Sequence, residues 1–261
     1  YTSNASRVPA WRWLFALGVM LLISNAWAGG PSPLIWPADS AGHVALDGRY
    51  AVLVDGARAL NSEAVLAGRH DAEFITASRR DTNFGFTHAE IWLRLAIAYQ
   101  ASHSAPPVLV IPRPLIDDVD LYAVDSAGVV SHAATGDNHP FSSRQVAYRG
   151  FAFLLDVKAG QTVTYYLRAR SDTGPISLPL ELVDSATFRA DSASENYGRG
   201  AFVGFMVGLA LCALTLFALV RNVAYAYYCQ YLVAFVLLLC AADGYAMQFL
   251  WPNAPLAQQI L

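Results

Sequence analysis

Two long, nearly uncharged stretches dominate the C-terminal part of the sequence. They occupy residues 201–220 and 224–242, separated by three residues, and neither contains proline. Each approaches the roughly 20 apolar residues with which a helix crosses a hydrocarbon core of about 30 Å. A soluble core helix seldom runs so far without a polar face, although a very apolar buried helix pair is the alternative. The sequence therefore predicts a membrane hairpin with transmembrane helices at residues 200–221 and 224–243.

A second targeting pattern lies at the N-terminus. Two arginines precede an apolar run at residues 13–23, and the small residues Ala26 and Ala28 follow it. This order is typical of a secretory signal peptide, with an uncleaved signal anchor as the alternative. We therefore expect a signal peptide at residues 1–28, a linker at residues 29–44, and delivery of the following chain to the outside of the cytoplasm.

The orientation of the hairpin follows from that delivery. The first span would emerge in the cytoplasm at Arg221, in agreement with the positive-inside tendency, and the second span would return the chain to the outer face. Residues 244–261 are then expected to form a periplasmic loop with a truncated end. We expect the chain to be part of a longer membrane protein.

The middle of the chain has the composition of a soluble domain. The three cysteines of the chain all fall in the two apolar stretches, so no disulfide is expected outside the membrane. The net charge is only -3 and no basic patch stands out, which makes nucleic acid an unexpected partner. The lipid bilayer is the partner that the apolar stretches predict.

Short alternating or apolar runs between turn residues predict strands in this domain. They are expected at residues 50–54, 91–99, 108–111, 119–124, 129–133, 151–157, 162–170 and 176–182. Turns at residues 125–128 and 158–160 are expected to close hairpins, and Asn61 or Ser62 to cap a short helix. Many short antiparallel strands and few helices predict a mainly β fold, a jelly-roll sandwich at residues 45–188. A linker at residues 189–199 would join it to the membrane.

Arginines inside two of the predicted strands need solvent or a carboxylate. Arg94, Arg168 and Arg170 are expected to pair with acidic residues, and an anion or sugar-hydroxyl site is the alternative. The possible partners are Asp118, Asp120 and Asp156.

The richest polar loop runs from residue 135 to residue 148. It combines hydrogen-bonding groups with aromatic rings, the mixture that a sugar or small polar ligand needs, although plain connectors share this composition. Trp92 could stack on a sugar ring or pack in the sheet. The candidate ligand-binding residues are Trp92, Asp137, His139, Arg144 and Tyr148.

Catalytic and metal-binding motifs are missing from the sequence. It contains no Gly-x-Ser-x-Gly, no His-Glu-x-x-His and no phosphate-binding glycine loop. His132, Asp137 and His139 match no zinc spacing. We therefore expect no enzyme activity, no metal and no cofactor in this chain.

Several short motifs in order resemble a known family. The chain resembles the bacterial seven-transmembrane receptors with diverse intracellular signalling modules, whose type-two extracellular domain precedes the membrane region. The motifs are the runs at residues 91–94, 118–122, 135–137, 151–153 and 166–168, Pro140 with Arg144, and the membrane stretch from Gly200 to Pro252.

This resemblance implies a jelly roll related to carbohydrate-binding modules, followed by the first two helices of a seven-helix region. It also implies a cytoplasmic output beyond this chain, such as a diguanylate cyclase or histidine kinase.

The leading hypothesis is a sensor in the bacterial inner membrane whose periplasmic domain binds a small ligand, carbohydrate-like or other. The alternative is a membrane-anchored carbohydrate-binding or envelope-assembly module without signalling output. Gly200, Gly204 and Gly208 have small-xxx-small spacing, which permits close helix contact and a homodimer.

Overall fold

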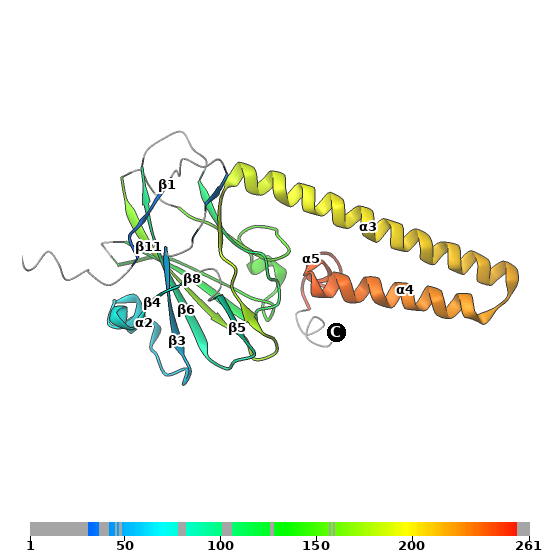
Figure 1. Cartoon of the computed structure of the whole chain (residues 1–261), viewed down its shortest axis with the longest axis horizontal. Coiled ribbons are helices and arrows are strands. Elements are labelled where there is room, and N and C mark those ends of the chain that lie inside the picture. Colours follow the sequence, from blue (N-terminus) through cyan, green and yellow to red (C-terminus); the bar gives the residue numbers. More distant parts are fainter. Residues whose placement is uncertain are drawn as a thin grey trace, which may run out of the picture.

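The computed structural model describes residues 31–36, 42–44, 46, 49–77, 82–100, 106–125, 128–156, 158 and 160–254. The predicted signal peptide at residues 1–28 lies outside these residues. Within them, a domain of β-sheets is followed by a long helical hairpin (Figure 1).

A large sheet of seven strands forms one layer of the domain. Its order is β4-β3-β6-β11-β8-β9, and β1 adds to β6 as a parallel strand while the other pairs are antiparallel. The strands are β1 (Leu34–Trp36), β3 (Tyr50–Asp55), β4 (Ile75–Ala77), β6 (Glu90–Tyr99), β8 (Asp118–Asp125), β9 (Gly128–Thr135) and β11 (Thr162–Arg170).

A small sheet of four antiparallel strands forms the second layer, in the order β10-β7-β13-β2. Its strands are β2 (His43–Val44), β7 (Pro107–Ile111), β10 (Phe151–Leu154) and β13 (Glu181–Asp184). A separate pair joins β5 (Asn83–Gly85) to β12 (Ile176–Ser177). The short helical elements are α2 (Ser62–Leu66), η1 (Asp71–Glu73) and η3 (Phe141–Ser143).

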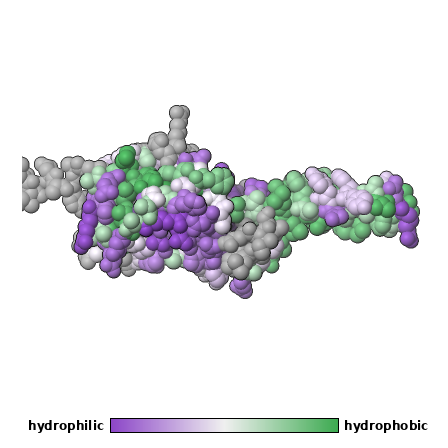
Figure 2. All heavy atoms as spheres, turned by 90° about the horizontal axis from the view of Figure 1, so that it is seen from below, coloured by the Kyte–Doolittle hydropathy of each residue, from purple (hydrophilic) through white to green (hydrophobic). Residues whose placement is uncertain are grey.

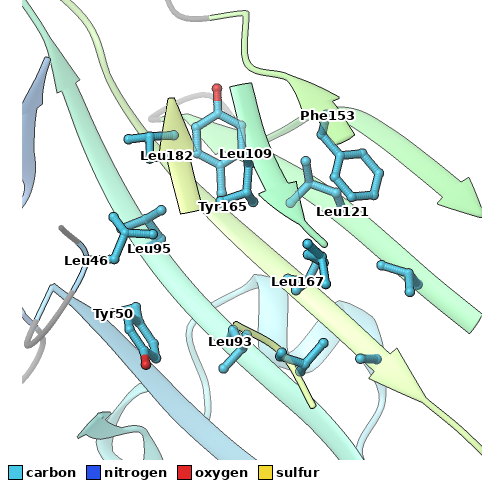
Figure 3. Packing of buried hydrophobic residues seen from close by; sticks show 14 of the residues in the cluster. Leu46, Tyr50, Leu93, Leu95, Leu109, Leu121, Phe153, Tyr165, Leu167 and Leu182 are labelled. Carbon is cyan, nitrogen blue, oxygen red and sulfur yellow. The ribbon is translucent and has the colours of Figure 1, made fainter. Parts of the chain in front are cut away.

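The core lies between the two sheets. In β6, every second residue from Ile91 to Ile97 is apolar and almost fully buried, because alternate side chains of a strand point to the same face. Leu109, Phe153 and Leu182 meet this face from the small sheet (Figure 3). Deleting one such leucine side chain typically costs about 2–5 kcal/mol, so this layer accounts for much of the domain's stability.

The outer face of the large sheet carries ion pairs. Arg94 binds Asp71 at 2.7 Å, while Arg168 pairs with Asp120 at 3.2 Å and Arg170 with Asp118 at 3.0 Å, two of the possible partners predicted. These arginines are therefore held by structural salt bridges, the first of the two predicted alternatives. The partner of Arg94 was missed because Asp71 belongs to a 3-10 turn distant in sequence.

Most predicted strands are present, with one error in connectivity. The turn at residues 158–160 does not close a hairpin, because β10 pairs with β7 in the small sheet whereas β11 pairs with β6 and β8 in the large sheet. The chain crosses from one layer to the other here. The strand predicted at residues 176–182 is divided into β12 and β13, and Asn61 caps α2 by accepting a hydrogen bond from Glu63.

The helical hairpin consists of α3 (Ser185–Val220) and α4 (Val223–Ala242), followed by the short α5 (Tyr245–Phe249). Asp184 caps α3 directly after the last strand of the small sheet, accepting from the amides of Ala186 and Thr187. Residues 189–199, expected as a linker, lie inside α3, so no flexible joint separates the sheet from the apolar stretch.

Both long helices are long and apolar enough to cross a membrane. Only 11% and 6% of their most apolar windows are buried within the chain, which disfavours the alternative of a buried soluble helix pair. On the face drawn in Figure 2, the hairpin is mostly hydrophobic, whereas the domain mixes hydrophilic and hydrophobic residues. At 1.5 Å per residue, α3 is about 54 Å long, which exceeds a hydrocarbon core of about 30 Å by about 24 Å.

Candidate ligand groove between the small sheet and helix α3

The N-terminal part of α3 lies over the outer face of the small sheet and leaves a cavity of about 600 Å³ beside it. Its lining comprises His43, Val110, Tyr148, Glu181, Val183, Phe188, Asp191, Ser192, Ser194, Glu195, Gly198 and Arg199. We call this cavity the sheet–helix groove. Its size lies within the range of small-molecule sites, which often form where two structural units meet.

The floor of the groove is apolar and aromatic. Tyr148 and Phe188 meet edge to face with ring centroids 5.3 Å apart, in a cluster that includes Val110 and Val183. Burial raises the pKa of Tyr148 to about 12, so its hydroxyl stays protonated and can donate or accept a hydrogen bond at neutral pH. A ring face beside such a hydroxyl suits a ligand that has both apolar and polar surface.

The walls of the groove are polar and charged. His43 contacts Asp191 at 2.9 Å, and Arg149 binds Glu195 at 3.1 Å. These contacts tie the small sheet and the loop before β10 to α3. His43 and Asp191 are both more than half exposed, so water or a ligand can reach them. The acidic groups come from α3 and β13, two elements that a ligand in the groove would touch together.

Tyr148 is the only predicted site residue among those lining the sheet–helix groove. Arg144 is buried nearby, where its Nη1 donates to the carbonyls of Tyr148, Arg149 and Gly150 at 2.6–2.9 Å. Its guanidinium also lies over the rings of Phe141 and Phe151. Burial lowers the pKa of Arg144 to about 10, which leaves it charged at neutral pH. The structure therefore gives Arg144 a role in holding its own loop.

Asp137 and His139 lie in the same loop but face the large sheet. His139 contacts Asp118 at 3.1 Å, and Asp137 is 4% exposed. Gly136 allows the loop to approach closely, because a Cβ atom there would lie 1.9 Å from the carbonyl oxygen of Asp117. Burial raises the pKa of Asp137 to about 7, repulsion from Asp117 adds to the shift, and Arg144 opposes it.

Trp92 lies apart from the other candidates, beneath α2. Its ring is fully buried and stacks on Tyr122 at 6.2 Å between centroids. It packs with Leu53, Val65 and Phe74, and no face of the ring is open to a sugar in this structure. Of the two predicted alternatives for Trp92, the structure shows packing in the sheet.

The groove residues on α3 were not predicted. Phe188, Asp191, Glu195 and Arg199 fall in or beside the segment interpreted as a linker, and a linker has no defined face. The capping residue Asp184 is the sequence signal that could have revealed them. Among the described residues, no group of three or more histidine, cysteine or acidic side chains is placed to hold a metal ion.

The end of the hairpin returns to the domain. Arg199 of α3 forms a salt bridge with Asp243, and the Tyr245 hydroxyl donates to Asn196 at 3.0 Å. The amide of Phe141 donates to the carbonyl of Pro252 at 2.8 Å. Among the described residues, the domain therefore contacts the hairpin both at the sheet–helix groove and at a second junction around α5, where Arg144 Nη2 lies 3.6 Å from Met247 Sδ.

Comparison with protein families identifies the class of protein. Residues 47–184 match the family model described as 7TMR-DISM extracellular 2, and residues 195–261 match the model for the 7TM diverse intracellular signalling region. The chain belongs to the family of seven-transmembrane receptors with diverse intracellular signalling modules. Its matched regions are an extracellular sensory domain and a 7TM signalling region, and neither is a catalytic domain.

Other comparisons add little to this assignment. No curated protein matches the chain. Two similar solved structures are β-glucuronidases from Ruminococcus gnavus, in complexes with C6-substituted uronic isofagomine and with uronic isofagomine, at 10% and 9% identity. They align over 57% and 60% of this chain and 30% of theirs, with TM-scores of 0.33 and 0.32. The chain thus spans under a third of those structures, and the likeness carries no argument about function.

Proposed function

We propose that this chain is the input half of a receptor in the bacterial inner membrane. A small periplasmic ligand, carbohydrate-like or other, binds in the sheet–helix groove and changes how α3 lies against the small sheet. The membrane bundle then passes this change to a cytoplasmic output beyond the chain. The observation that carries the proposal is that α3 lines the groove and continues without a break into the first apolar span.

The energetic requirement is a difference in affinity between two arrangements of α3. A ligand shifts an equilibrium only as far as its affinities for the two states differ. A ligand in the groove would contact the sheet through Glu181 and the helix through Asp191, so its affinity depends on their spacing. Because α3 is continuous, a small tilt at the groove also moves its far end. This geometry supports a sensor over a passive anchor.

Ligand binding can be tested on the full chain in lipid nanodiscs. A panel of neutral monosaccharides and disaccharides, amino sugars and small dicarboxylates would be screened by thermal shift and then by calorimetry. For a compound that binds, Asp191→Asn and Tyr148→Phe should weaken affinity by about tenfold each, because each removes a polar contact but keeps the shape. Asp156→Asn, an exposed residue outside the groove lining, is the matched control. Binding that all groove variants retain would place the site elsewhere.

The periplasmic placement has its own test. A protease added outside spheroplasts should cleave the sandwich domain. A cysteine introduced at residue 221 should be protected from a thiol reagent that cannot cross the membrane. Digestion only after lysis would contradict the proposed orientation. If the domain is outside and binds ligand but α3 does not move on binding, the membrane-anchored carbohydrate-binding module becomes the better account.

A homodimer remains part of the proposal. Gly200, Gly204 and Gly208 lie on exposed parts of α3, where an added Cβ would meet nothing within 4 Å. Another helix can approach closely at such positions. Cross-linking at residue 204 in native membranes would detect the contact.

A further inference from the structure

The second junction between domain and hairpin contains a buried acid that the ligand groove does not use. Asp137 is 4% exposed, and its Oδ1 has no hydrogen-bond partner among the described residues. An unpaired buried carboxylate oxygen is costly, whereas a neutral carboxyl is much less so. The local structure around Asp137 is therefore more stable when its carboxyl is neutral than when it is ionised.

The acidic groups around Asp137 already have other partners, and a side-chain hydrogen bond with Asp117 favours the neutral form of Asp137. Asp117 already accepts four hydrogen bonds from the turn at residues 171–173, at 2.5–3.2 Å. Asp118 is held by His139 at 3.1 Å and by Arg170 at 3.0 Å. Two acidic neighbours thus oppose a charge on Asp137, and the guanidinium of Arg144 favours it.

Arg144 connects this acid to the membrane hairpin. Its Nη1 holds the carbonyls of residues 148–150, and its Nη2 lies 3.6 Å from the Sδ of Met247 in α5. The carbonyl of Arg149 in turn lies close to Gly244, the residue that precedes α5. The loop at residues 136–150 therefore carries both the acid and the surface on which α5 rests.

We propose that Asp137 is a proton-dependent switch that holds the loop at residues 136–150 against α5 when neutral and loosens this junction when ionised. A negative charge on Asp137 is repelled by Asp117 and Asp118. It is relieved only by drawing Arg144 away from its carbonyls or by opening the loop to water. Either movement weakens the contact with Met247 and the bond from Phe141 to Pro252.

The raised pKa of Asp137, about 7, places this transition near neutrality. The junction is then closed in mildly acidic surroundings and looser in alkaline ones. A receptor of this design would respond to the acidity outside the membrane in addition to any ligand in the groove.

Hydrogen exchange of the full chain in lipid nanodiscs tests the switch at about pH 5.5 and about pH 8, after correction for the intrinsic pH dependence of exchange. Peptides covering residues 136–150 and 245–252 should lose protection by about tenfold or more at the higher pH, with a midpoint near 7. Asp137→Asn, which is always neutral, should keep both peptides equally protected at both pH values.

Two further variants separate Asp137 from its neighbours. His139→Gln, which removes the imidazole that contacts Asp118, should retain this pH-dependent step in protection. Asp156→Asn, an exposed acid, should also behave like the unmodified chain. The proposal is overturned if the unmodified chain shows no step, if Asp137→Asn keeps it, or if His139→Gln abolishes it. A step in the loop without one in residues 245–252 would also overturn it, since α5 would then be uncoupled.

Discussion

The two junctions between domain and hairpin are formed by different kinds of contact. At the sheet–helix groove, α3 rests on an aromatic floor with half-exposed ion pairs such as His43 with Asp191. At the α5 junction, Arg144 is 8% exposed and makes several short bonds to carbonyls. Exposed pairs contribute about 0–1 kcal/mol, whereas buried charged groups are costly to disturb. The difference suggests a groove that can adapt to a ligand beside a junction with few stable arrangements.

Removing the centre of the α5 junction should have the largest effect. Arg144→Ala leaves three carbonyls without their donor and a gap between Phe141 and Phe151, so we expect a loss of about 3–5 kcal/mol in unfolding free energy. Urea unfolding of the full chain in detergent would measure it. Arg113→Ala, at an exposed arginine, is the control and should change stability little. A loss below about 1 kcal/mol for Arg144→Ala would mean that the junction is not specially stable.

The acid beside Arg144 should make stability depend on pH. The pKa of Asp137 is about 7 in the folded chain and 3.8 ordinarily, so the folded state binds more protons between these values. Its contribution is fully present below pH 3.8 and is lost as pH rises through 7. Asp137→Asn should match the unmodified chain near pH 4 and exceed its stability by about 4 kcal/mol above pH 7. Parallel profiles of unfolding free energy against pH for the two proteins would refute this.

Gly244 tests the close approach of α5 to the domain. Its φ is +81°, and an added Cβ would lie 2.5 Å from the Arg149 carbonyl oxygen. Gly244→Ala should therefore cost about 1–2 kcal/mol or more and increase hydrogen exchange in residues 140–150. Gly160→Ala, at a glycine with a φ of +78° where an added Cβ meets nothing within 4 Å, serves as the control. Equal behaviour of the two variants would show that α5 does not dock on the domain.

At the groove, the smallest change concerns the start of α3. Asp184 accepts from the amides of Ala186 and Thr187, so Asp184→Ala should cost about 1 kcal/mol and loosen the first turn over the small sheet. Asp184→Asn should retain most of the cap. Circular dichroism melting of both variants would show whether Asp184→Ala is the less stable of the two. An Asp184→Ala protein as stable as the unmodified chain would indicate that packing of Phe188 alone sets the helix start.

The sequence predicted local elements better than their connections. Alternation in residues 91–97 identified β6 and its buried face, because a strand with one apolar face has one workable register. The step from β10 to β11 between layers was missed, since a short turn containing glycine suits a hairpin equally well. The parallel pairing of β1 with β6 depends on contacts remote in sequence, which periodicity does not reveal. The jelly-roll order itself stays a prediction.

The candidate site was predicted less well for a related reason. Polar and aromatic residues in the loop at residues 135–148 suggested a ligand surface, but Arg144 and Asp137 are buried by groups from β8 and α5 that the local sequence does not specify. Tyr148 joins the groove only because α3 continues over the small sheet. A segment of small and polar residues at 189–199 indicated a linker, whereas its cap and its contacts make it helical.

The continuity of α3 is the central claim, and hydrogen exchange measures it directly. In nanodiscs, amides of residues 189–199 should exchange slowly and as one unit with those that follow them toward the membrane, because a continuous helix opens cooperatively. The account predicts no boundary of protection near residue 200. Fast exchange across residues 189–199, between a protected sheet and a protected span, would show a flexible linker and contradict transmission through a single helix.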